Sequence, residues 1–206
     1  FALQDQYGFV IASDECYSEI YFGDDAPLGS LQAASKLGRS WDDLVMFTSL
    51  SKRSNVPGLR SGFVAGDAKW MAAFLEYRTY HGSAMGLPIQ HASIAAWNDE
   101  EHVRLNQALY QQKFDLFVGK LQAAYEVNIP DASFYVWLKV PNGDDVAYTQ
   151  RLWQTQGVQV LPGRLLARDT EHGNPGQGYV RIALVATVEE CAEAAERLLT
   201  FAQHGF

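Results

Sequence analysis

The chain of 206 residues has few cysteines, no unbroken apolar run long enough to span a bilayer, and no run of basic residues. Its two cysteines, Cys16 and Cys191, lie far apart and form no CxxC pair, which is typical of reduced thiols in a cytoplasmic protein. The 24 acidic residues outnumber the 16 basic ones and leave a formal charge of −8, which repels phosphate backbones. We therefore predict neither nucleic acid nor a membrane as a partner.

Several signatures of catalytic and metal sites are also missing. The histidines show no HxxxH spacing and no pairing with cysteine, so the sequence predicts no zinc or other metal site; they are His81, His91, His102, His172 and His204. No GxSxG motif and no Walker-type glycine loop occurs. The chemistry of the protein must be sought in other residues.

The composition that is present is that of a folded protein. Hydrophobic residues make up 48% of the chain and aromatic residues 13%, so the chain can bury a core, and its length fits one large domain or two small ones. The segment Phe1 to Tyr7 resembles the tail of a helix already under way, without a cap or an initiator Met. We therefore expect the chain to be the C-terminal part of a longer protein.

Apolar and periodic patterns place the secondary structure. Short apolar runs predict strands at 9–12, 44–47, 62–66, 134–140, 158–161 and 179–185. Helical periodicity predicts helices at 68–80 after the possible cap Asp67, at 89–98, 100–127 and 144–156, and a last one behind a capping box of Thr187 and Glu190. Turn formers predict an irregular connection over 23–43. The series after residue 130 is typical of a small α+β domain.

The stretch LVMFTSLSKRSNVPGLRSGFVAGD, residues 44–67, contains the most informative residues. Between two predicted strands it carries Ser49, Ser51, Lys52 and Arg60 in a polar segment broken by proline and glycine. A lysine amine forms a Schiff base with an aldehyde, and pyridoxal phosphate is the common aldehyde cofactor. Serine hydroxyls and a guanidinium suit its phosphate. The alternative is a surface loop with ordinary basic residues.

Two further residues fit the same cofactor. Asp14 follows the first predicted strand, where open α/β sheets hold ligands, and its carboxylate is suited to keep a pyridine nitrogen protonated. The hydroxyl of Tyr17 is suited to hydrogen-bond the phenolate oxygen of the ring. The alternative for Asp14 is a helix cap or a turn former.

The segments SDECYSEIYF and TSLSKRSNVPGLRSGFVAG, together with YVRIALV near the end, resemble the class I aminotransferases, which are fold type I pyridoxal-phosphate enzymes. The resemblance extends over nearly the whole chain. It implies an α/β fold, with part of the sheet of a large domain followed by the small α+β C-terminal domain. We accordingly expect the C-terminal part of the cofactor-binding domain in 1–98, a long linking helix in 99–129 and the small domain in 130–206.

The resemblance also implies a role for each candidate residue. Lys52 would hold the cofactor covalently and later move a proton between the substrate α-carbon and the cofactor. Asp14 would face the pyridine nitrogen and Tyr17 the phenolate oxygen, while Ser49 and Arg60, helped by Ser51, would bind the phosphate. Arg181 would bind the α-carboxylate of the substrate from the small domain, although without the resemblance a surface ion pair at a strand edge is the favoured explanation of this arginine. Members of the family are homodimers, with active sites at the subunit interface.

Finer similarity points to one subfamily. The segment LPGRLLARDTEHGNPGQGYVRIALVA, with SKRSNVPGLRSGFVAGD, is similar to the bacterial N-succinyldiaminopimelate aminotransferases of lysine biosynthesis. This similarity implies transfer of an amino group from glutamate to N-succinyl-2-amino-6-oxopimelate. Arg53, Arg164 and Arg168 are candidates to meet the extra carboxylates of that substrate, although loop arginines are more often solvated.

Two other functions share the predicted fold. One is different pyridoxal-phosphate chemistry, such as a C–S lyase, which would need Lys52, Asp14 and Arg60 equally. The other is a cofactor-sensing effector domain of a transcription regulator, which would need a DNA-binding segment upstream.

Overall fold

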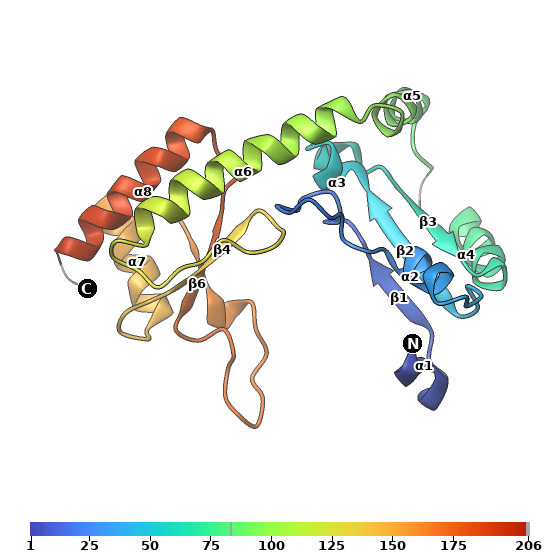
Figure 1. The fold of residues 1–206 in the computed structure, drawn as a ribbon, viewed down its shortest axis with the longest axis horizontal. Coiled ribbons are helices and arrows are strands. Elements are labelled where there is room, and N and C mark those ends of the chain that lie inside the picture. Colours follow the sequence, from blue (N-terminus) through green and yellow to red (C-terminus); the bar gives the residue numbers. More distant parts are fainter. Residues whose placement is uncertain (83, 205–206) are drawn as a thin grey trace. The chain divides into compact units, whose positions relative to one another are not determined.

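A computed structural model describes residues 1–82 and 84–204, and the chain in it divides into two compact units, residues 1–107 and 108–206 (Figure 1). The predicted domain ranges 1–98 and 130–206 include residues 83, 205 and 206, which lie outside the described residues. The structure places the division at residue 107. The roles expected for the ranges, a cofactor-binding domain, a linking helix and a small domain, stay predictions.

The first unit is built on a three-stranded sheet in the order β1-β2-β3. β1 (Ile11–Asp14) runs parallel to β2 (Leu44–Ser49), and β2 runs antiparallel to β3 (Gly62–Gly66). Asp14 and Ser49 are the last residues of the two parallel strands, so both lie at the same edge of the sheet. The topology thus brings two of the candidate residues to one place.

The first strand differs from its prediction over 9–12. It begins at Ile11, where pairing with Leu44 starts, because Gly8 in the left-handed conformation ends the preceding helix α1 (Ala2–Tyr7). Phe9 and Val10 precede the paired residues and are 44% and 38% exposed. The predicted strand over 9–12 was therefore wrong in its bounds, because an apolar run does not show at which residue strand pairing begins.

Helices flank this sheet (Figure 1). α4 (Ala68–Tyr80) has the predicted bounds, and the predicted cap is confirmed, because the Asp67 side chain accepts a hydrogen bond from the Lys69 backbone. α5 (Leu87–Trp97) starts two residues before its prediction, since Gly86 serves as the cap and Pro88 occupies the first turn. The connection over 23–43 is not wholly irregular, because it contains α2 (Ser30–Lys36).

The second unit has an antiparallel sheet in the order β4-β6-β5. Its strands are β4 (Tyr135–Lys139), β5 (Leu161–Pro162) and β6 (Tyr179–Ala183). The predicted strand over 158–161 was largely wrong, because β5 pairs with β6 only where Leu161 and Pro162 face Arg181 and Val180. The helices α7 (Asp145–Gln156) and α8 (Val188–Gln203) complete this unit, together with the part of α6 (Glu101–Leu121) that follows residue 107.

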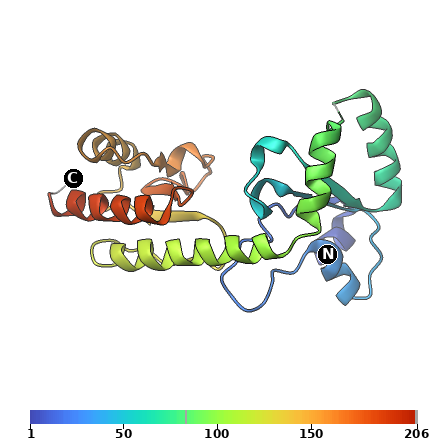
Figure 2. The same ribbon diagram turned by 90° about the horizontal axis from the view of Figure 1, so that it is seen from above.

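Apolar side chains of these helices and strands form the core of the second unit. Fully or almost fully buried residues come from each element; they include Phe114, Phe117, Leu121, Val136, Leu138, Leu152, Val180 and Leu198. In Figure 2, α8 runs beside the part of α6 that belongs to this unit, and Lys120 pairs with Glu196 between them. The predicted capping box of α8 is confirmed, with Thr187 and Glu190 bonding each other's backbone.

The helix predicted over 100–127 ends earlier, at Leu121. Turns follow, with Ala124 N bonded to Leu121 O, and Tyr125 and Val127 are buried there. The apolar residues packed in these turns continue the helical spacing of the sequence. The periodic pattern therefore predicted a helix longer than the one that forms. In the described part of the chain, no helix combines the length and apolarity needed to cross a membrane.

Candidate active site

Lys52 lies in a single helical turn that directly follows β2, in the connection between β2 and β3. This turn, α3 (Leu50–Arg53), is capped by Ser49, whose hydroxyl accepts a hydrogen bond of 3.3 Å from the Ser51 backbone. Leu50 is fully buried, and its backbone N–H donates to the carbonyl of Ser61. The apolar anchor and the cap fix the turn at the edge of the sheet and leave the lysine side chain only half-buried.

A hollow of about 380 Å³ opens beside this turn. The residues lining it come from the segment just after β1, from the end of β2 and the lysine turn, and from the residues that lead into β3: Cys16, Ser49, Ser51, Lys52, Arg60, Ser61 and Gly62. Four residues selected from the sequence, namely Ser49, Ser51, Lys52 and Arg60, therefore share one surface depression. Their grouping follows from the antiparallel pairing of Ser49 with Gly62, which returns the chain to the lysine turn.

Sequence reasoning did not select the other three residues of the hollow. Ser61 is buried and its hydroxyl lies 2.7 Å from that of Ser93, a partner on α5 that the sequence gives no means of finding. Gly62 has a simpler signal, its position at the start of a predicted strand. A Cβ there would lie 2.4 Å from the Thr48 carbonyl oxygen, so the close approach of the two strands requires glycine.

Arg60 adopts a backbone conformation that is uncommon for its residue type. Its φ is 54°, in the left-handed region, at the end of the 3₁₀ turn η1 (Pro57–Leu59). Such a residue stores on the order of 1 kcal/mol of strain and is most often retained where it serves a function. One guanidinium nitrogen donates to the Pro57 carbonyl at 2.9 Å, and the side chain is otherwise exposed at the hollow.

Asp14 lies beside the hollow and not in its lining. Its carboxylate accepts a hydrogen bond of 3.1 Å from the Cys16 backbone, and the Ser49 hydroxyl lies 3.4 Å from the Cys16 sulfur. Hydrogen bonds from the side chain and backbone of Cys16 lower the pKa of Asp14 below its ordinary value of 3.8. The carboxylate is therefore ionised at neutral pH, as a partner for a protonated ring nitrogen must be.

The thiol of Cys16 behaves differently. Burial raises its pKa above the ordinary value of 9.0, so the thiol stays protonated at neutral pH. Tyr17, the next residue, is 38% exposed, and the Lys52 ammonium lies 5.9 Å from its ring centroid. That separation is at the outer limit of a cation–π contact, so the two side chains are neighbours at the same site.

Arg181 belongs to the second unit, where it lies on β6 opposite Trp137 of β4. Its guanidinium carbon lies 4.1 Å from the centroid of the Tyr135 ring, a stacking contact that the planar side chain favours. The ion pair considered from the sequence is not among the contacts found for Arg181 in the described residues. The role of Arg181 in binding the substrate α-carboxylate stays a prediction.

The three arginines considered for extra substrate carboxylates differ in their surroundings. Arg53 is 4% exposed and binds Glu19 at 2.9 Å and Glu100 at 2.6 Å, so the expectation that it meets a substrate was wrong. Arg164 likewise binds an internal carboxylate, that of Asp145, at 2.7 Å. Arg168 is exposed in the loop over 162–178 and keeps its candidate role.

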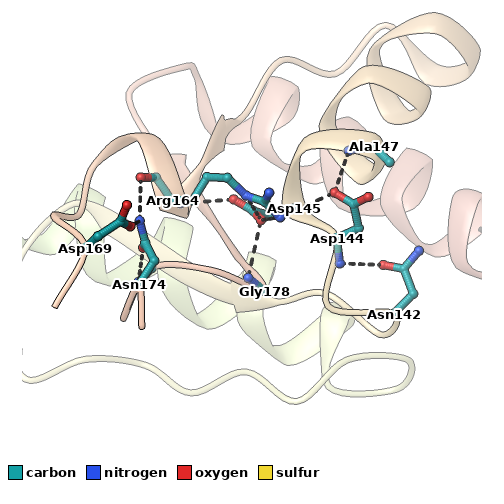
Figure 3. A network of polar contacts seen from close by, with 9 residues as sticks. Asn142, Asp144, Asp145, Ala147, Arg164, Asp169, Asn174 and Gly178 are labelled. Carbon is teal, nitrogen blue, oxygen red and sulfur yellow. Dashed lines mark hydrogen bonds and ion pairs between the residues drawn. The ribbon is translucent and has the colours of Figure 1, made fainter. Parts of the chain in front are cut away.

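The partner of Arg164 organises that loop (Figure 3). Asp145 is fully buried at the start of α7, and its carboxylate accepts bonds from the Arg164 backbone at 3.0 Å and from the Gly178 backbone at 3.4 Å. Asn174 in turn donates to the Arg164 carbonyl and to Asp169. Asp145 thus attaches both ends of the loop to α7, and Arg164 has a structural role at one of these ends.

Comparisons with known proteins agree with this geometry. Residues 1–198 match the family described as aminotransferase class I and II. An aminotransferase from Neisseria meningitidis, known from a crystal structure, is 66% identical, with a TM-score of 0.94 over 98% of this chain and 51% of that one. A probable N-succinyldiaminopimelate aminotransferase from Thermus thermophilus is 27% identical, with a TM-score of 0.78 over 96% of this chain and 51% of that one.

Among curated proteins, the LL-diaminopimelate aminotransferase of Natranaerobius thermophilus is 34% identical over 195 residues, which is 93% of this chain and 48% of the relative. The chain therefore spans about half the length of the relatives it matches. The family match covers nearly all of the chain, and the solved structures reproduce its fold throughout. The chain belongs to the class I and II aminotransferases, a family of pyridoxal-phosphate enzymes with the fold type I architecture.

Proposed function

We propose that the full-length protein is a pyridoxal-phosphate-dependent aminotransferase in which Lys52 holds the cofactor. One observation carries the proposal: the amine of Lys52, the guanidinium of Arg60 and the hydroxyls of Ser49 and Ser51 line a single hollow. An amine suits the aldehyde, and a forked cation with two hydroxyls suits the phosphate. The alternatives, a lyase and a sensor domain, have no comparable support from the relatives named above.

The described residues fit such a cofactor in size and in charge. A volume of about 380 Å³ lies within the range of roughly 300 to 1,000 Å³ that small-ligand sites occupy. The ionised Asp14 is bonded to Cys16, which itself lines the hollow, so a carboxylate stands next to the space that a ring would fill. When bound, the cofactor supplies an electron sink for the bond to the substrate α-carbon.

The protein's own groups have distinct tasks in this proposal. Lys52 holds the cofactor and serves as the base and acid that moves the proton of the α-carbon. Asp14 keeps the ring nitrogen protonated, and the Tyr17 phenol donates a hydrogen bond to the ring oxygen. Arg60, with Ser49 and Ser51, fixes the phosphate. Arg181 binds the α-carboxylate of the substrate in the active form, which we propose to be a homodimer.

Replacement of Lys52 tests the attachment. In the full-length protein, borohydride reduction followed by peptide mass analysis should place a phosphopyridoxyl group on Lys52. The Lys52→Ala variant should lose that group and at least 10³-fold of kcat, because holding the cofactor and moving the proton both need the amine. Lys69→Ala, which removes an exposed amine on α4, is the matched control and should behave as wild type. Label on another lysine in the wild-type protein would refute the proposal.

We further propose a substrate related to diaminopimelate, with N-succinyl-2-amino-6-oxopimelate as the amino acceptor and glutamate as the donor. The similarity to the Thermus thermophilus protein supports the succinylated substrate. The relatives at 34% identity support a second candidate, LL-diaminopimelate without the acyl group. Comparison of kcat/KM on the succinylated and the free diaminopimelate decides between them, because only one of these substrates carries a charged second amine.

A further inference from the structure

Arg53, the residue directly after Lys52, has surroundings that the proposed chemistry does not explain. Its side chain is only 5% exposed, and arginine is almost never buried to this extent unless it is paired. One guanidinium nitrogen donates to Glu19 at 2.9 Å, and the two terminal nitrogens together donate to both oxygens of Glu100 at 3.3 and 2.6 Å. The guanidinium carbon also lies 5.2 Å from the centroid of the Trp97 ring.

These partners come from three separate parts of the first unit. Glu19 lies after β1, Trp97 is the last residue of α5, and Glu100 directly precedes α6. Among the described residues, the hydrogen bonds found for this guanidinium come from its two terminal nitrogens and go to the two carboxylates. The Nε is buried and has no acceptor there. The hydrogen bond from Arg53 lowers the pKa of Glu100, which is therefore ionised at neutral pH. A buried, forked cation between two carboxylates fixes position more strictly than a lysine would.

The residues around Arg53 are fastened to the start of α6 as well. Asn106 donates to the backbone carbonyl of Lys52 itself at 3.4 Å and accepts a bond of 2.5 Å from Asn55. The Ser54 hydroxyl lies 2.8 Å from the Nε2 of His102. Each of the four residues 52–55 therefore has a polar contact with the segment 100–106.

We propose that Arg53 is a positioning residue for Lys52: its ion pairs with Glu19 and Glu100 hold the backbone of the lysine turn where the amine reaches the reacting atoms. This inference rests on the proposed function of Lys52. A displacement of about 1 Å in a reacting group can lower a rate roughly 10²-fold, so a loosened turn would slow turnover without removing any group that touches the substrate.

Two measurements on the full-length protein test the inference. Hydrogen exchange of the backbone in residues 50–55 reports the stiffness of the turn whether or not Lys52 carries a cofactor. Steady-state kinetics report how well the amine is placed. For Arg53→Met we expect exchange in this segment to rise about tenfold and kcat to fall roughly 10- to 100-fold, with KM within about twofold of wild type.

Two more variants keep the outcome interpretable. Glu100→Gln weakens the same contact through a side chain that is 60% exposed, so the fold tolerates it, and it should give a smaller change of the same kind. Arg104→Met removes an arginine of α6 that is 69% exposed and paired with Glu101, and it should match wild type. If Arg53→Met unfolds the protein, Glu100→Gln decides alone.

Three results would overturn the inference. The first is that hydrogen exchange and kcat of Arg53→Met equal those of Arg104→Met. The second is that Arg53→Met raises KM and leaves kcat unchanged, which would mark a substrate contact. The third is that Glu100→Gln is identical to wild type. Failure of the proposed function is recognised separately, because it would appear as a wild-type protein without phosphopyridoxyl label on Lys52.

Discussion

Asp14 shows what a single residue contributes to the site. It closes β1, its pKa is lowered by the hydrogen bonds from Cys16, and it stands beside the hollow that contains Lys52. We expect Asp14→Ala in the full-length protein to lower kcat roughly 10²- to 10³-fold, because the pyridine nitrogen of the proposed cofactor loses its fixed anionic partner. Cofactor should stay bound through Lys52 and Arg60, as absorbance of the purified protein would report.

Asp24→Ala, which removes an exposed carboxylate from the segment after β1, is the control for Asp14→Ala and should leave kcat unchanged. The pH dependence offers a separate check. Since the folded pKa of Asp14 is below 3.8, its carboxylate is ionised above about pH 4, and any loss of activity through its protonation should begin only below that pH. Loss of bound cofactor in Asp14→Ala together with unchanged kcat per bound cofactor would assign Asp14 to anchoring alone.

At the residue scale, the sequence predicted which residues carry the chemistry better than it predicted which residues contact one another in the fold. Ser49, Ser51, Lys52 and Arg60 could be selected because they follow one another within a short stretch between two strands. The burial of Arg53 could not be predicted, because its carboxylate partners lie 34 and 47 residues away and the intervening chain has to fold first. Long-range polar contacts leave no periodic pattern in a sequence.

At the scale of elements, the buried Asp145 ties α7 to the loop before β6. Burial pushes the pKa of Asp145 upward, but the hydrogen bonds from Arg164 and Gly178 outweigh it and hold that pKa below the ordinary value. We expect Asp145→Ala to lower the free energy of unfolding of the full-length protein by about 2 to 4 kcal/mol, because the loop loses its attachment at both ends. Urea unfolding with tryptophan fluorescence would measure the change.

The same carboxylate makes stability depend on pH. A group whose pKa is lowered by folding stabilises the protein above its unfolded pKa and loses that effect as the pH falls through the folded value. The difference between wild type and Asp145→Ala should therefore be constant above about pH 5 and shrink below about pH 4. Glu126→Ala, which removes an exposed partner of Lys139, should cost less than about 1 kcal/mol at any pH. A constant difference down to pH 2 would contradict the assignment to Asp145.

Elements with explicit end signals were the ones that the sequence predicted well. α4 starts at the cap Asp67 and α8 at the Thr187 capping box, and both follow from side-chain to backbone hydrogen bonds that are local. β5 and the end of α6 depend instead on pairing with β6 and on packing of Tyr125 and Val127. Tertiary contacts set those boundaries, and local pattern alone misplaced them.

At the scale of the whole molecule, the first unit has a helix without a buried residue. α4 contains none, and it exposes large apolar side chains along its length: Trp70, Phe74, Leu75, Tyr77 and Tyr80, from 37% to 86%. Several large apolar side chains exposed on one helix are typical of an interface. Because the chain spans about half the length of its relatives, we predict that this surface is covered in the full-length protein.

The 206-residue chain expressed alone should therefore bind the dye 8-anilinonaphthalene-1-sulfonate strongly, whereas the full-length protein, which we propose to be a homodimer, should not. Replacing two of the most exposed residues, as in a Leu75→Glu/Tyr80→Glu variant of the 206-residue chain, should reduce the dye fluorescence, because charge interrupts the apolar surface. The same double substitution in the full-length protein should lower its solubility or its dimer mass in light scattering, since charges would then be buried against a partner surface. Equal dye binding per mole by the two proteins would mean that α4 stays exposed in the complete molecule, and its apolar side chains would then need another explanation.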